Sequence, residues 1–179
     1  MIIKCDYRIA SVTDGYSLLL RNKHIDNEEH RLQGNSVLFI HGATYGSTST
    51  FDYKIGGESW MDKMAAEGFD VWCLDLLGYG ESDRPEEMLV APELNDPIVD
   101  TAHALAEVDL AVDFILADRD IHQLSLIGYS WGSAICGRYA GEFEGKVSRL
   151  VLSGALWVEK GATPRTISAD IGAYRTVDA

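Results

Sequence analysis

One stretch, Gln123-Leu-Ser-Leu-Ile-Gly-Tyr-Ser-Trp-Gly132, contains the strongest structural signal in the chain. Residues 123–128 form an apolar run that favours a strand buried in a parallel sheet, and residues 133–142 have the pattern of a helix. Gly128-Tyr-Ser-Trp-Gly132, a G-x-S-x-G motif, joins them. A serine on a sharp strand-to-helix turn has a strained backbone, and glycine two residues to either side avoids a clash with the turn. We therefore predict that the Ser130 hydroxyl projects above the edge of a sheet.

Alternating strands and helices extend in both directions from this motif. Runs of β type at residues 7–12 and 16–21 flank the turn signal Thr13-Asp-Gly15 and predict a hairpin. Further interior strands are predicted at residues 35–41, 69–74 and 147–152. Helices are predicted at residues 58–67 and from a cap at Asn95-Asp-Pro97 to Leu116. This order indicates an α/β fold, a mostly parallel sheet with helices on both faces.

The composition excludes several classes of protein. With 179 residues, 46% hydrophobic and 24% charged, the chain fits one folded domain. Fifteen Lys and Arg against 28 Asp and Glu give a net charge of −13, which disfavours nucleic acid as a partner. No apolar run approaches the ~20 residues that span a bilayer. Three widely separated cysteines suit a reducing compartment, so we expect a cytoplasmic protein.

A second loop is expected at the same edge of the sheet as Ser130. His41-Gly-Ala-Thr-Tyr-Gly46 follows the strand at 35–41, and ligand sites of open α/β sheets form at the carboxyl ends of the strands. A tetrahedral intermediate needs N–H donors, and the backbones of Ala43 and Trp131 are the candidates, with Gly42 allowing the close turn. For His41, anchoring of the loop is favoured over proton transfer. The candidate pocket residues are Thr44, Tyr129 and Trp157.

Three ordered matches relate the sequence to a known superfamily. They are Leu38-Phe-Ile-His-Gly-Ala43, Asp75-Leu-Leu-Gly-Tyr-Gly-Glu-Ser-Asp83 and Leu126-Ile-Gly-Tyr-Ser-Trp-Gly132. From the hairpin to Gly154, the chain resembles the α/β-hydrolase fold superfamily. The resemblance implies that Ser130 attacks the substrate and that Ala43 and Trp131 form the oxyanion hole. Serine at the elbow argues against the haloalkane dehalogenase and epoxide hydrolase branches, which use Asp there.

The acid and histidine of the superfamily's catalytic triad are missing after Ser130. That triad runs Ser, then Asp or Glu, then His, but all five histidines here precede Ser130, and Ser153-Gly-Ala155 lacks the carboxylate of some relatives. The histidines are expected away from the nucleophile: His24 and His30 in a loop, His103 on an acidic helix and His122 at the far end of its strand.

We therefore divide the chain into residues 1–154, an α/β-hydrolase core lacking its C-terminal strands, and residues 155–179, the start of a lid. Loss of a triad member leaves only ~10³ to 10⁴-fold catalysis over water, so we expect this chain alone to be nearly inactive. An unpaired sheet edge would favour self-association.

Other motifs favour structural roles. Asp75 and Asp83 are interpreted as turn caps paired with Arg84 rather than catalytic carboxylates. Gly78-Tyr-Gly80 begins like a dinucleotide fingerprint, but no helix is predicted until about Pro97, so no nucleotide cofactor is expected. The spacing of His, Cys and carboxylates fits no metal site. Trp60 and Trp72 are expected in the core, Trp131 and Trp157 nearer the pocket.

The favoured function is hydrolysis of a small carboxylic ester or related acyl compound through an acyl-enzyme, with no cofactor. Hydrolysis of a carbon–carbon or amide bond uses a similar scaffold and stays open. So does a non-catalytic protein, either one that binds a small apolar ligand or an inactive half fold that depends on a partner.

Overall fold

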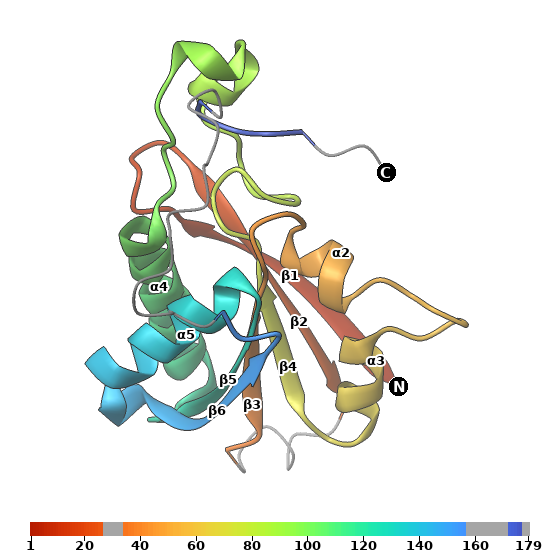
Figure 1. Ribbon diagram of the computed structural model, residues 1–179. Coiled ribbons are helices and arrows are strands. Elements are labelled where there is room, and N and C mark those ends of the chain that lie inside the picture. The colour runs from red at the N-terminus through yellow and green to blue at the C-terminus, as the bar shows by residue number, and fades with distance from the viewer. Residues whose placement is uncertain (27–33, 157–171, 177–179) are drawn as a thin grey trace.

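The computed structural model describes residues 1–26, 34–156 and 172–176, and a mixed sheet lies at its centre (Figure 1). The six described strands lie in the order β1-β2-β4-β3-β5-β6. They are β1 (Ile2–Ala10), β2 (Ser17–Ile25), β3 (Ser36–Ile40), β4 (Asp70–Leu74), β5 (Leu124–Tyr129) and β6 (Val147–Ser153). β4, β3, β5 and β6 run parallel to one another, while β2 pairs antiparallel with both β4 and β1. The predicted α/β class and mostly parallel sheet are confirmed.

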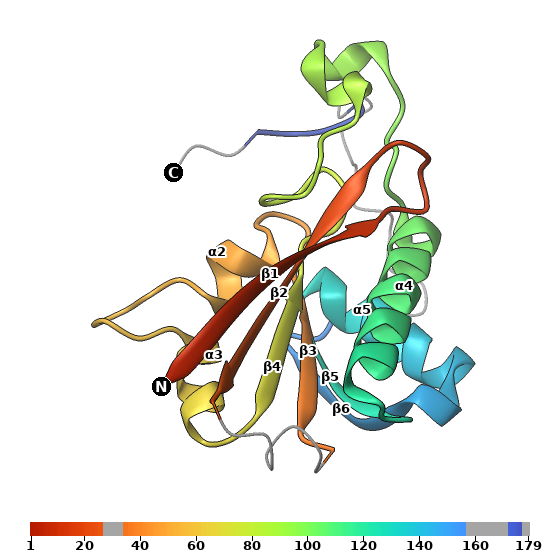
Figure 2. The same ribbon diagram turned by 180° about the vertical axis from the view of Figure 1, so that it is seen from behind.

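Helices cover both faces of the sheet. The two opposite views of Figures 1 and 2 show α2 (Ser47–Phe51) and α3 (Trp60–Ala66) on one side and α4 (Thr101–Arg119) and α5 (Trp131–Glu142) on the other. Alternate side chains of β3 serve the two faces: Phe39 packs in the cluster with α2 and α3, and Leu38 and Ile40 pack in the cluster with α4 and α5. This two-sided burial explains the continuous apolar run of β3.

The N-terminal hairpin is longer than predicted. β1 and β2 pair from Ile2 opposite Ile25 to Ala10 opposite Ser17, and Gly15 in the turn has a φ of 85°. His24, predicted in a loop, therefore lies buried in β2, and His30 lies outside the described residues. Sequence patterning missed this part of β2 because its side chains are polar. They are nevertheless buried, because each has a polar partner: Asn22 donates to Asp70, Lys23 pairs with Asp52 and Asp62, and Nδ1 of His24 lies beside Asn22 Oδ1.

The start of α4 also differs from the prediction. The helix begins at Thr101, and the carboxylate of Asp100 accepts the backbone N–H of His103 at 2.8 Å, so Asp100 is the N-cap. The predicted cap at 95–97 was wrong: that segment follows a short 3₁₀ helix, η2 (Pro92–Leu94). Two further 3₁₀ helices are η1 (Glu86–Leu89) and η3 (Glu144–Lys146).

The helices between β3 and β4 show what short-range patterns miss. α2, only five residues long, was not predicted because one turn and a half shows no periodicity. α3 begins at Trp60, since Ser59 and Asp62 form a capping box in front of it. Trp60 is 46% exposed, so its assignment to the core was wrong, whereas Trp72 is fully buried as predicted.

β6 is an edge strand of the described sheet. Leu150, Val151 and Leu152 on it are 38%, 50% and 44% exposed, an unusual exposure for three successive large apolar residues. Self-association through this edge stays a prediction, as does the division at residue 154, because residues 157–171 and 177–179 lie outside the described part. Within the described ranges, no helix combines the length and apolar character needed to cross a bilayer.

Candidate active site

Ser130 occupies a strained turn between β5 and α5. Its φ of 53° and ψ of −117° lie in a region that residues with a side chain rarely adopt, at a cost of ~1–3 kcal/mol. Backbone hydrogen bonds hold it there. Its N–H donates to the carbonyl of Ser153 at 2.9 Å, and its own carbonyl accepts the N–H of Ser133 at 2.9 Å and the hydroxyl of Ser133 at 2.5 Å. The end of β6 and the first turn of α5 thus fix the conformation of Ser130.

The two flanking glycines allow close backbone approach at this turn. A Cβ on Gly128 would lie 2.3 Å from the carbonyl oxygen of Gly132, and a Cβ on Gly132 would lie 2.2 Å from that of Ile40. Neither glycine has a positive φ, so their role is steric rather than conformational. The sequence argument for glycine at both positions therefore has a geometric basis in the structure.

The loop after β3 lies against Ser130. A Cβ on Gly42 would be 3.1 Å from the Cβ of Ser130 and 3.5 Å from its Oγ, so the two segments predicted to converge do so. Ala43, the next residue, is exposed. Trp131 is the first residue of α5, a position whose N–H has no acceptor within the helix. Its indole Nε1 donates to Thr101 Oγ1 at 3.1 Å, which fixes the ring against α4.

His41 is a buried anchor of this loop. Its Nδ1 lies 2.6 Å from the carbonyl oxygen of Gly42, and its Nε2 accepts the backbone N–H of Leu76 at 3.2 Å. Burial lowers the pKa of His41, which favours the neutral ring with its proton on Nδ1. Because both ring nitrogens are occupied, His41 cannot take the proton of Ser130, in agreement with the sequence interpretation.

The other described histidines are engaged or distant. Nδ1 of His24 lies 2.6 Å from Asn22 Oδ1 within β2, and Nε2 of His103 lies 3.1 Å from the buried carboxylate of Glu107. His122 precedes β5, whereas Ser130 follows that strand. Within the described part of the chain, the hydroxyl of Ser130 therefore has no imidazole in position to act as its base.

Asp75 and Asp83 hold the loops around the site. The fully buried Asp75 carboxylate accepts hydrogen bonds from the N–H and hydroxyl of Thr48 and from the N–H of Glu81. Asp83 accepts the N–H and hydroxyl of Ser17 at 2.7 and 2.8 Å, and these bonds lower its pKa. The turn-capping prediction is thus confirmed, but the pairing with Arg84 was wrong: its Nη2 donates to the Gly80 carbonyl at 3.2 Å.

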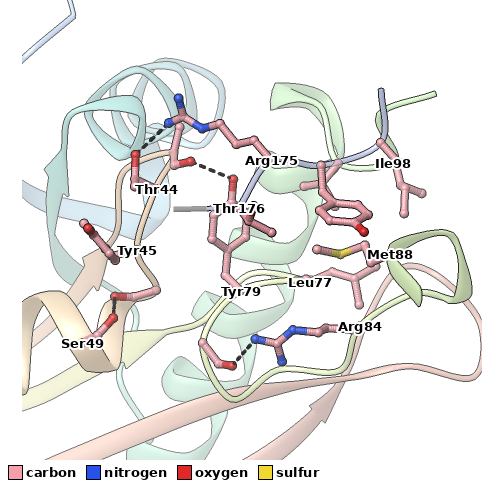
Figure 3. Close-up of a pocket in the computed structure, with 17 residues that line it drawn as sticks. Thr44, Tyr45, Ser49, Leu77, Tyr79, Arg84, Met88, Ile98, Arg175 and Thr176 are labelled. Carbon is pink, nitrogen blue, oxygen red and sulfur yellow. Dashed lines mark hydrogen bonds between the residues drawn. The ribbon is translucent and has the colours of Figure 1, made fainter. Parts of the chain in front are cut away.

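A cavity of about 570 Å³ lies beside the loop after β3 (Figure 3). The loop after β3, the turn after β4 and residues 173–176 form its walls. Its lining includes Ala43 and Thr44 but neither Ser130 nor Tyr129. Tyr129 is 44% exposed, and Trp157 lies outside the described residues. The loop after β3 therefore touches Ser130 through Gly42 and the cavity through Ala43.

Sequence reasoning missed the two charged residues that line this cavity, Arg84 and Arg175. Nη2 of Arg175 donates to Thr44 Oγ1 at 2.8 Å across 131 residues of sequence, and no local pattern marks such a contact. Tyr79, whose hydroxyl donates to the Ala43 carbonyl at 3.3 Å, also lines the cavity, and burial raises its pKa. Among residues 1–26, 34–156 and 172–176, no group of three His, Cys, Asp or Glu side chains could hold a metal ion.

Comparison with known proteins identifies the family. The family model described as "alpha/beta hydrolase fold" matches residues 35–171, more than half of the chain. The chain belongs to the alpha/beta hydrolase fold family. That match includes β3 to β6, the loop after β3 and the elbow, which are the parts that place Ser130.

Individual relatives are more distant. The uncharacterized protein Rv2715 of Mycobacterium tuberculosis is 26% identical over 80% of this chain, and haloalkane dehalogenase 1 of Mycobacterium bovis is 27% identical over 72%. This chain spans 36% and 37% of those two proteins. The crystal structure of epoxide hydrolase VrEH1 from Vigna radiata has a TM-score of 0.62 and 16% identity, covering 90% of this chain and 43% of that one. At that identity the likeness shows the shared fold.

Proposed function

We propose that Ser130 is the nucleophile of a serine hydrolase that acts on a small carboxylic ester or related acyl compound. The observation that carries this proposal is the backbone of Ser130, a φ of 53° beside Gly42 on the loop after β3. Strain of this kind persists only where surrounding structure imposes it, and it is concentrated at functional sites. A serine that served only as a turn residue would be replaced by glycine without loss.

The reaction would proceed through an acyl-enzyme. Ser130 Oγ would attack the carbonyl carbon of the substrate, and the N–H groups of Ala43 and Trp131 would stabilise the negative charge that develops on its oxygen. Collapse of this intermediate would expel the alcohol and leave the acyl group on Ser130. Water would then release the acid and restore the hydroxyl.

Proton transfer needs a base that the described residues do not place near Ser130. We propose that a carboxylate and a histidine from sequence outside these 179 residues complete the triad, in the order Ser, acid, His. The positions of His24, His41, His103 and His122 support this, because none of them is placed beside Ser130. The 179-residue chain alone should then be nearly inactive.

The related proteins support a small-molecule substrate but leave the bond open. Two of them are named haloalkane dehalogenase and epoxide hydrolase, and both names refer to small-molecule substrates. Ser130 stands where those branches use Asp, so we favour an acyl ester over a halide or an epoxide. Carbon–carbon or amide hydrolysis would use the same nucleophile, whereas a non-catalytic binding protein would not need one.

A fluorophosphonate probe tests the nucleophile directly. We expect slow labelling of the 179-residue chain, located at Ser130 by mass spectrometry and accelerated by added imidazole, which supplies the missing base. The control variants are Ser130→Ala, which should abolish labelling, and Ser148→Ala at an exposed site on β6, which should leave it unchanged. Labelling that persists in Ser130→Ala would overturn the proposal. Rapid labelling without imidazole would contradict the expected inactivity of the isolated chain.

A further inference from the structure

The charge around the cavity is opposite in sign to the charge of the chain. The sequence has a net charge of −13 with 28 acidic residues, yet no Asp or Glu is among the described residues that line the cavity. Two arginines, Arg84 and Arg175, line it instead. The remaining lining residues that carry hydroxyl groups are Thr44, Tyr45, Ser49, Tyr79, Tyr174 and Thr176. The lining therefore offers positive charge and hydrogen-bond donors in an otherwise acidic molecule.

Both arginines retain capacity to bind an anion. Each donates through Nη2 to a neutral oxygen, Arg84 to the carbonyl of Gly80 and Arg175 to the hydroxyl of Thr44. Neither forms an ion pair with a carboxylate in the described part of the chain; the arginines that do are Arg8, Arg21, Arg119 and Arg138. A guanidinium has five N–H donors in a planar fork that matches an oxyanion. Most of these donors thus stay available on both side chains.

Figure 3 shows that the guanidinium groups of Arg84 and Arg175 lie around the same cavity. Arg175 and Arg84 approach the cavity from different sides, with the ring of Tyr79 between them. The carboxylate of Asp75 packs directly against Gly46 and Gly80, two residues that line the cavity, and Asp75 itself is not among the lining residues. Three hydrogen bonds from Thr48 and Glu81 already engage Asp75, so it is not aimed into the cavity. A volume of about 570 Å³ suits a small organic molecule.

We propose that this cavity binds the charged end of an anionic substrate, a small acyl ester that bears a carboxylate or a phosphate, recognised by Arg84 and Arg175. This inference rests on the proposed function, because it assigns the cavity to the substrate of Ser130. Arg175 contacts Thr44, the neighbour of Ala43, so a molecule held by this arginine lies beside the loop that touches Ser130.

Calorimetric titration of the Ser130→Ala chain separates binding from turnover. The probes are monomethyl adipate, which has an ester and a free carboxylate, its neutral counterpart dimethyl adipate, and propyl phosphate. We expect one of the two anions to bind and the diester to bind at least tenfold more weakly. Sodium chloride should weaken the binding of the anion, because the arginines are exposed.

Three arginine variants locate the site. Arg84→Gln and Arg175→Gln should each raise the dissociation constant at least about tenfold, the typical effect of removing a charge-assisted hydrogen bond. Arg138→Gln removes a charge on α5 that is also exposed, is paired with Glu142 and lies outside the cavity lining, so it should have no effect. The lower dissociation constant, that of monomethyl adipate or that of propyl phosphate, identifies whether the site prefers a carboxylate or a phosphate.

Two results would overturn the inference: equal binding of the neutral diester, or anion binding that is absent or unaffected by both cavity variants. Because the titration uses a chain without the Ser130 hydroxyl, its outcome is independent of the labelling experiment. If the anion binds but Ser130 is not labelled, the proposed hydrolase function is refuted and the anion site is not. If Ser130 is labelled but no anion binds, the assignment of the cavity is refuted and the hydrolase function is not.

Discussion

Replacement of Gly132 by alanine should destabilise the protein even though alanine favours helices. The added Cβ would lie 2.2 Å from the carbonyl oxygen of Ile40 and 2.5 Å from that of His41. Carbon–oxygen contacts normally begin near ~3.3 Å, so α5 and the end of β3 would have to separate by about 1 Å. Backbone atoms cannot rotate away, which places the overpacking cost at the upper end of its usual range, ~3 kcal/mol. Helix propensity returns up to ~1 kcal/mol, leaving a net loss of about 2 kcal/mol.

Gly137→Ala is the matched control for this substitution. Gly137 lies in the same helix, and nothing is within 4 Å of the position of its Cβ. Alanine there should stabilise the fold by about 0.5–1 kcal/mol through helix propensity alone.

Urea unfolding followed by circular dichroism distinguishes the two variants. With a slope of ~2 kcal/mol per molar urea, Gly132→Ala should lower the midpoint by about 1 M, and Gly137→Ala should raise it slightly. If both variants unfolded at the same midpoint, contact between α5 and β3 would not be what requires glycine at position 132.

Three further predictions concern the backbone and the buried carboxylates. Ser130→Gly should be more stable than Ser130→Ala by ~1 kcal/mol in urea unfolding, because glycine accepts the φ of 53° without strain. Glu107→Ala should cost ~2–3 kcal/mol in the same assay, since the buried carboxylate accepts the N–H of Leu77 at 2.9 Å and the hydroxyl of Ser11 at 2.7 Å. Burial raises the pKa of Asp70, but the hydrogen bond and charge of Arg119 outweigh it, so the pKa lies below 3.8 in the fold. The stability that ionised Asp70 contributes is therefore present above pH 3.8 and lost as the pH falls through its lowered pKa, and melting temperatures between pH 7 and 3 should fall less steeply in Asp70→Asn.

Each of these predictions has its own control. For the elbow, equal stability of the glycine and alanine variants would mean that the backbone of residue 130 carries no strain. Glu107→Gln keeps one acceptor oxygen and should lose less than Glu107→Ala; the reverse order would contradict the hydrogen-bond argument. For Asp70, a slope with pH identical to that of the parent protein would show that this carboxyl is not among the groups whose protonation destabilises the fold.

The family and the elbow could be predicted from the sequence because their signals are local. The apolar run before Gly128 and the spacing of the two glycines depend on neighbours within a few residues, and the structure places them where that spacing requires. The role of His41 as an anchor was also predictable, since it follows a buried strand directly. The roles of Ala43 and Trp131 as oxyanion donors and of Ser130 as the nucleophile are proposals that rest on the same local geometry.

Buried charge was the main source of error in the fold. Arg21 and Lys23 end the apolar run of the hairpin, so periodicity placed the end of β2 too early. Their burial depends on carboxylates such as Asp52, which directly follows α2 and forms ion pairs with both side chains. The N-cap at Asp100 was missed because several acidic residues precede α4 and the sequence pattern does not distinguish among them.

The amino-acid order alone was sufficient for the α/β class, the strand-to-helix turn and its serine, because hydrophobic periodicity and glycine spacing are properties of consecutive residues. Only the folded chain decided that Arg84 and Arg175 share a cavity with Thr44 and that acidic side chains are absent from its described lining. Such a juxtaposition joins residues up to 131 positions apart, and long-range proximity follows from how the sheet and its loops pack.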